Sequence, residues 1–244
     1  MKPWLFVFAV STALLAQDAI PAGTILPIQL NSSLNSKKIQ AGRVITATIM
    51  QAVPLPASKL PIGTKVIGHV VSVSRATATD GARISFEFDS IAPSRNEAIP
   101  VTTDLRALAS LMEVEQAQVP ISGPDRGTSQ NAWTTVQVGG DVVYRGGGPV
   151  VNGSQVVAEP AANGVLARAL SGPETKCRGE VSDNDRPQAL WVFSSEACGA
   201  YGFSDLAIVH AGRSEPLGQI TLAATRGDLN IRSGSGMLLR VNAR

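Results

Sequence analysis

The sequence has little charge, few aromatic residues and almost no histidine. Charged residues make up 16% of the 244 positions, against roughly 25% in an average domain, and 21 Lys and Arg nearly balance 19 Asp and Glu. A net charge of +2 is too small for the basic surface that nucleic-acid binding requires, so no nucleic-acid partner is expected. Aromatic residues amount to 5%, which disfavours a ligand cleft built from stacked rings.

Motifs for catalysis, metal binding and cofactor binding are also missing. Gly234-Ser235-Gly236 lacks the spacing of a nucleophile elbow and predicts a hairpin turn. A zinc site needs roughly three or four ligands, and the only histidines, His69 and His210, are far apart in sequence and are expected to be structural. Asp183-Asn184-Asp185 resembles a calcium loop but lacks the closing glutamate, so a solvated turn is expected. No catalytic residue, metal ligand or cofactor site is therefore predicted, and the chain is expected not to be an enzyme.

The chain does contain one apolar run at its start and ample apolar surface elsewhere. Hydrophobic residues make up 44% of the chain, which excludes wholesale disorder. The run from Leu5 to Ala16 is too short for a bilayer-spanning helix, which needs about 20 residues, and fits the core of a signal peptide. Residues 1–16 are therefore predicted to be removed, leaving no transmembrane span. The protein is expected to be exported: periplasmic, associated with the outer envelope, or secreted.

The two cysteines, Cys177 and Cys198, both lie in the exported part of the chain. Export places them in an oxidising environment, where a pair is usually bonded, so a disulfide is predicted. The loop that it closes would stabilise the fold by about 3 kcal/mol in the chain-entropy model. A catalytic thiol is the alternative, but the sequence places neither histidine beside either sulfur.

Residues 17–103 predict a small antiparallel β-barrel or sandwich. Alternating β-branched and aromatic residues are separated by turn signals at Gly42, Pro61-Ile62-Gly63 and Asp80-Gly81. No helical stretch separates these strands, so neighbouring strands must be antiparallel. The predicted strands cover 24–30, 44–49, 65–73 and 83–91.

The rest of the chain predicts an all-β protein with one helix. Leu105, Leu108, Leu111 and Met112 recur at helical spacing, which indicates an amphipathic helix over 104–118. Residues 119–171 are rich in Gly and predict hairpins or a linker. From residue 172 the sequence predicts a second small β domain, pinned by the disulfide, with strands over 188–194, 205–210, 219–223, 228–231 and 237–241.

Several blocks of the first β unit resemble the C-terminal β-barrel of the TrbI family of conjugal-transfer and type IV secretion channel subunits. Ala22 to Ser36 is similar to the opening of that barrel, and Leu60-Pro61-Ile62-Gly63 through Gly68 looks like its Pro-x-Gly turn and following strand. Arg83 to Ile91 and Ile99-Pro100-Val101 are similar to the next strand and the closing strand. The resemblance covers about residues 20–105 and implies an envelope-associated barrel module.

The leading hypothesis is a non-enzymatic cell-envelope protein whose barrel engages envelope proteins. Its suggested contact anchors are Trp133, Tyr144, Trp191 and Tyr201, although core burial is the expected fate of Trp191. One alternative is a secreted glycan hydrolase with a carboxylate pair drawn from Glu174, Glu180, Asp183, Asp185 and Glu196. Another is a small-ligand carrier that uses the barrel mouth. The sequence does not predict an oligomeric state.

Overall fold

A computed structural model defines most of the chain beyond the predicted signal peptide. The structure describes residues 19–119, 133–140, 142–145, 150–152, 155–161, 164–169, 177 and 187–243. Residues 1–16, the predicted signal peptide, lie outside this part. No helix in the described ranges has the length and apolar character needed to cross a membrane.

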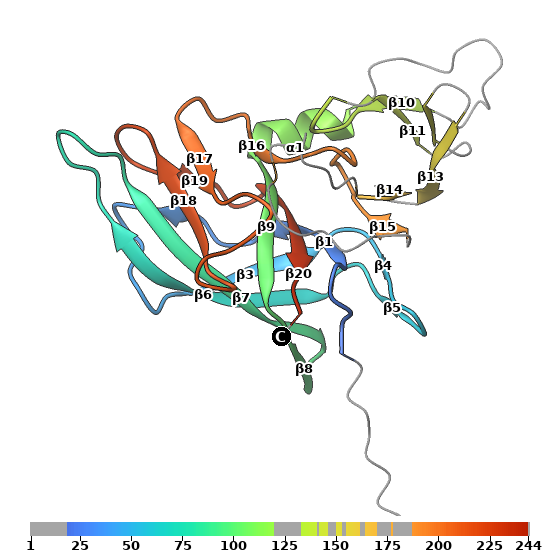
Figure 1. Ribbon diagram of the computed structural model, residues 1–244, viewed down its shortest axis with the longest axis horizontal. Helices are drawn as coiled ribbons and strands as arrows, with labels where there is room; N and C mark the ends of the chain where they lie inside the picture. Colours follow the sequence, from blue (N-terminus) through green and yellow to red (C-terminus); the bar gives the residue numbers. More distant parts are fainter. Residues whose placement is uncertain are drawn as a thin grey trace, which may run out of the picture.

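A single ten-stranded sheet curls into a nearly closed barrel (Figure 1). Its strands follow the order β16-β9-β20-β1-β3-β6-β7-β18-β17, and β8 pairs with β7. All neighbours are antiparallel except β16 and β9. The bounds are β1 (Ile25–Leu30), β3 (Val44–Ile49), β6 (Lys65–Ser74), β7 (Arg83–Ser94), β8 (Glu97–Pro100), β9 (Thr103–Ala109), β16 (Gly199–Tyr201), β17 (Leu206–Val209), β18 (Ile220–Ala224) and β20 (Gly236–Val241).

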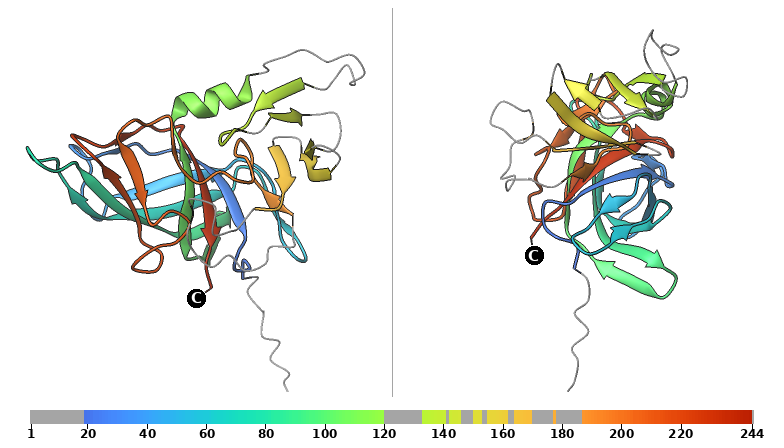
Figure 2. Two further views of the ribbon diagram at one scale, coloured as in Figure 1. Left: turned by 45° about the horizontal axis from the view of Figure 1, so that its top comes forward. Right: turned by 90° about the vertical axis from the view of Figure 1, so that its right-hand side faces the viewer.

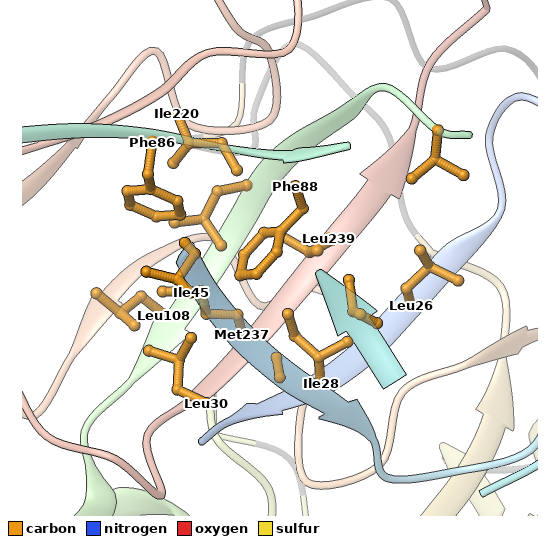
Figure 3. Close-up of a cluster of buried hydrophobic side chains, with 14 of the residues drawn as sticks. Leu26, Ile28, Leu30, Ile45, Phe86, Phe88, Leu108, Ile220, Met237 and Leu239 are labelled. Carbon is orange, nitrogen blue, oxygen red and sulfur yellow. The ribbon is translucent and has the colours of Figure 1, made fainter. Parts of the chain in front are cut away.

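The barrel encloses a core of aliphatic side chains around two phenylalanines (Figure 3). Alternation along β6 sends Val66 and Val70 inward and leaves the residues between them partly exposed. Phe86 and Phe88 meet edge to face, with ring centroids 5.7 Å apart. Full burial of each large apolar side chain contributes roughly 1.5–3 kcal/mol, so this core is the main source of stability. The fully buried residues labelled in the close-up include Leu26, Ile28, Ile45, Leu108, Met237 and Leu239.

A glycine allows the two longest strands, β6 and β7, to cross closely. Their register shifts between Ile67 and Gly68. A Cβ atom at Gly68 would lie 1.9 Å from the backbone oxygen of Glu87 and 2.9 Å from the Cα of Phe88. Only glycine fits this approach, because backbone atoms cannot move aside as a flexible side chain can.

Short elements lie outside the main sheet. β2 (Leu34–Asn35) pairs with β19 (Asn230–Ile231), and β4 (Val53–Pro54) pairs with β5 (Lys59–Leu60). A helix, α1 (Leu111–Gln118), follows β9. The described parts of 119–171 confirm the predicted hairpins: β10 (Trp133–Val136) pairs with β11 (Val142–Arg145), and β12 (Val150–Asn152), β13 (Gln155–Ala161) and β14 (Gly164–Ala167) form a sheet with β15 (Gln188–Ala189).

A second apolar cluster covers the outer face of the barrel where β1, β9 and β20 run side by side. It joins Ile25, Ala107 and Leu238 of the barrel to Val114 of α1 and to the buried segment 190–193. Figure 2 shows α1 and the added strands gathered on this one side of the barrel.

Two buried glutamines hold this added layer to the barrel. Gln51 donates from Nε2 to the backbone oxygen of Val165 at 2.8 Å, and its Oε1 accepts from the backbone N–H of Trp191. Gln188 returns the contact, since its Oε1 accepts from the backbone N–H of Ile25 at 2.9 Å.

The helix predicted over 104–118 is only half correct. Residues 103–109 form strand β9, and the helix begins at Leu111 after the N-cap Ser110, whose hydroxyl accepts from the backbone N–H of Glu113. All seven residues of β9 are buried, with one apolar cluster inside the barrel and the other outside. A strand buried on both faces shows no alternation, so the spacing of Leu105 and Leu108 imitated a helix.

The predicted division into two β domains is also corrected by the sheet. β20 lies between β1 and β9, and β18 pairs with β7. The C-terminal strands were placed close to their true bounds, but they complete the first barrel instead of building another. The predicted barrel over 17–103 is thus only part of a barrel that the last forty residues close.

Candidate functional site

The barrel is left open at one seam, between β16 and β17. These strands stand at the two ends of the sheet order, and each pairs with a neighbour on one side only: β16 with β9, and β17 with β18. The link 202–205 joins them directly. A groove of about 500 Å³ lies along this seam, lined mainly by small and aliphatic residues with Tyr201, His210 and Arg213 as its larger polar members. Ligand pockets typically fall in the range of about 300–1,000 Å³.

Backbone hydrogen-bonding groups face the seam from both strands. On β17, the backbone N–H of Thr225 donates to the oxygen of Asp205 at 2.8 Å, and Ala207 and Val209 continue this register against β18. Antiparallel pairing alternates, so the N–H and C=O groups of Leu206 and Ile208 point away from β18, toward the seam. On β16, the oxygen of Tyr201 accepts from Ser110, which leaves Ala200 facing the seam.

The β16 wall is anchored from behind by a buried arginine on β9. Arg106 is 2% exposed; its Nε donates to the oxygen of Ala197 at 3.0 Å and its Nη2 to the oxygen of Ser195 at 2.8 Å. Burial lowers the pKa of Arg106 to about 10, Arg240 lowers it further and Tyr201 opposes the change. The guanidinium is therefore still charged at neutral pH, where it ties the segment before β16 to the barrel.

The start of β16 is fixed twice more, by Tyr201 and by the disulfide. The Tyr201 hydroxyl donates to the oxygen of Cys198 at 3.1 Å and accepts from its N–H at 2.9 Å. The predicted disulfide is confirmed: Cys198 is bonded to Cys177, with the Cα atoms 5.6 Å apart. Gly212 packs on this bridge, since a Cβ atom there would lie 2.9 Å from Cys177 Cβ.

The rim of the groove beyond β17 carries positive charge. Arg213 is exposed, and its Nη2 lies 3.4 Å from Nδ1 of His210. The backbone turns here: His210 has a φ of 58°, and its oxygen accepts from the N–H of Arg213. No Asp or Glu of the described residues lines the groove. At the other end of β17, the carboxylate of Asp205 accepts from the hydroxyls of Ser204 and Thr225.

One of the four suggested anchors lies at the seam. Tyr201 lines the groove, whereas Trp191 is 4% exposed within the second apolar cluster, which confirms its expected burial. The side chains of Trp133 and Tyr144 lie outside the described part of the structure. Sequence reasoning missed Arg106 and the two free strand edges. A charged residue inside the apolar run 105–109 was the one available signal for Arg106.

The other sequence-stated sites do not come together within the described residues. Glu196 is exposed, and the other four carboxylates considered for a hydrolase lie outside the described ranges. No three His, Cys, Asp or Glu side chains in the described ranges cluster as metal ligands. His69 Nδ1 lies 2.9 Å from Oδ2 of Asp89, a half-exposed pair. The barrel interior is filled by fully buried side chains, which argues against a carrier that uses the barrel mouth.

Comparison of the chain with protein-family models, with curated proteins and with solved structures finds no match. The seam and the sequence patterns therefore carry the functional argument.

Proposed function

We propose that the chain is an exported, non-enzymatic protein of the cell envelope whose TrbI-like barrel module engages envelope proteins at its open seam. The observation that carries the proposal is the pair of free strand edges, β16 and β17, on either side of a groove.

Free strand edges are normally protected, because unpaired N–H and C=O groups invite another chain. Protection takes the form of lysines, prolines, bulges or a covering loop. β17 reads Leu-Ala-Ile-Val and β16 reads Gly-Ala-Tyr, with neither charge nor proline in either strand. An unprotected edge beside a built groove is what a protein that binds extended partner segments requires.

Export and family resemblance are supported separately. The apolar run at the start of the chain has the length of a signal peptide, and a disulfide is typical of oxidising compartments. The blocks that resemble the TrbI barrel fall on β1, β6, β7 and β8, which pair in one sheet through antiparallel ladders.

The test is photo-crosslinking in the source cell, combined with fractionation. A photoreactive amino acid replaces Ala207, which is exposed on β17, or Ala57, which is exposed in the β4–β5 hairpin. The protein is expected in the envelope or secreted fraction, and crosslinking at position 207 is expected to capture an envelope protein that position 57 does not. A cytosolic pool, or equal capture from both positions, would refute the proposal.

A further inference from the structure

We propose that the seam binds a single extended, acidic segment of a partner protein, which adds to the barrel as a strand along β17. This inference rests on the proposed function and specifies the chemistry of the partner at the same groove.

The backbone of β17 supplies the register for an added strand. Leu206 and Ile208 direct their N–H and C=O groups away from β18, so an extended chain can form the next antiparallel or parallel ladder there. Their side chains pack against the barrel core, which keeps the strand straight and fixes the edge. Main-chain pairing of this kind provides affinity without requiring a particular partner sequence.

The two walls of the groove select a single chain over the sheet edge of a second copy. An edge strand brought by another barrel carries its own neighbour in the plane of the sheet, on the side away from β17. At the seam that side is occupied by β16, which belongs to the same barrel. A terminus or a loop in extended conformation has no such neighbour and can lie between the walls.

Charge at the seam favours an acidic segment. Arg213 and His210 line the groove, and the buried guanidinium of Arg106 lies behind β16. No carboxylate of the described residues faces them from the lining, and the nearby Asp205 carboxylate is engaged by two hydroxyls. A carboxylate on the bound segment would therefore meet Arg213 without a competing partner from the lining.

The groove is also organised before binding. Arg106, the disulfide and the Tyr201 hydroxyl all hold the β16 wall, so little ordering is required when a segment enters. Preformed sites of this kind retain more of their contact energy as affinity.

The test uses the purified, oxidised protein and fluorescent eight-residue peptides of alternating Val and Thr with one central Glu or one central Lys. Fluorescence anisotropy is expected to show saturable binding of the Glu peptide, about fivefold tighter than the Lys peptide. Arg213→Glu is expected to reverse this preference. Arg95→Glu changes net charge equally at an exposed turn between β7 and β8 and is expected to preserve it.

Two further measurements separate strand addition from simple charge attraction. Methylating every second backbone nitrogen of the Glu peptide should abolish binding in one of the two registers, because the methyl groups then face β17. In NMR spectra, the amides of Leu206 and Ile208 should shift and gain protection from exchange when the peptide binds.

The proposal is overturned if the Glu peptide does not saturate by about 1 mM, which corresponds to about −4 kcal/mol. It is also overturned if Arg213→Glu leaves the preference unchanged, if neither methylated register loses binding, or if the protein forms a dimer that blocks the groove. Failure here with continued crosslinking at position 207 in the cell would remove the strand-addition mechanism and leave the envelope function standing.

Discussion

Reducing the Cys177–Cys198 disulfide should lower the free energy of unfolding by about 3 kcal/mol. The two cysteines are 21 residues apart in sequence, and the chain-entropy cost of closing a loop of that length gives this value. For a chain of this size each kcal/mol moves the melting temperature by about 2–4 °C, so a fall of about 6–12 °C is expected. Both cysteines are less than one-tenth exposed, at 8% and 6%, so reduction should require prior opening or a strong reductant.

The assay is guanidinium and thermal unfolding at fixed pH, with and without a phosphine reductant. The double variant Cys177→Ser with Cys198→Ser is the control, because it should match the reduced protein and ignore the reductant. The reasoning is refuted if reduction costs less than about 1 kcal/mol, or if an alkylating reagent labels both cysteines in the native oxidised protein.

Three other substitutions test the fold and the seam. Gly68→Ala should destabilise by about 2–4 kcal/mol, because its Cβ meets backbone, whereas Gly42→Ala, at a φ of 80° with open space around it, should cost about 1–2 kcal/mol; equal losses in denaturant unfolding would contradict the steric reason. Gln51→Leu should cost about 2–4 kcal/mol and reduce amide-exchange protection around Trp191, which unchanged protection would disprove. Arg106→Met should cost about 2–4 kcal/mol and loosen β16, seen as faster exchange of its amides; a variant with wild-type exchange would show that the guanidinium is not the anchor.

Local patterns predicted the strands of this protein well, because alternation and turn residues act over a few positions. Segments such as 205–210 and 219–223 lie within a residue or two of β17 and β18. The strand β9 was mistaken for a helix because burial on both faces removes alternation. The disulfide could be predicted from composition and compartment alone.

The pairing of distant strands could not be predicted in the same way. Whether 237–241 starts another domain or inserts between β1 and β9 depends on contacts across more than two hundred residues, for which a single sequence has no local signal. The seam depends on that pairing, because it exists only where the completed sheet fails to close. Arg213 and Ala207 therefore could not be recognised as site residues before the topology was known.

The insertion of β20 between β1 and β9 has a consequence for the order of folding. β1 gains its second neighbour only when the last strand has been released, since Ile25 pairs with Arg240 and Gly23 donates to the oxygen of Val241. A chain that emerges from its N-terminus therefore cannot close this barrel while it is still being made. Contacts so distant in sequence also slow folding, because the ends of a long chain must meet before they stabilise each other. Until then the apolar faces of β1 and β9 remain exposed, and the unfinished barrel is the form most in need of protection from aggregation.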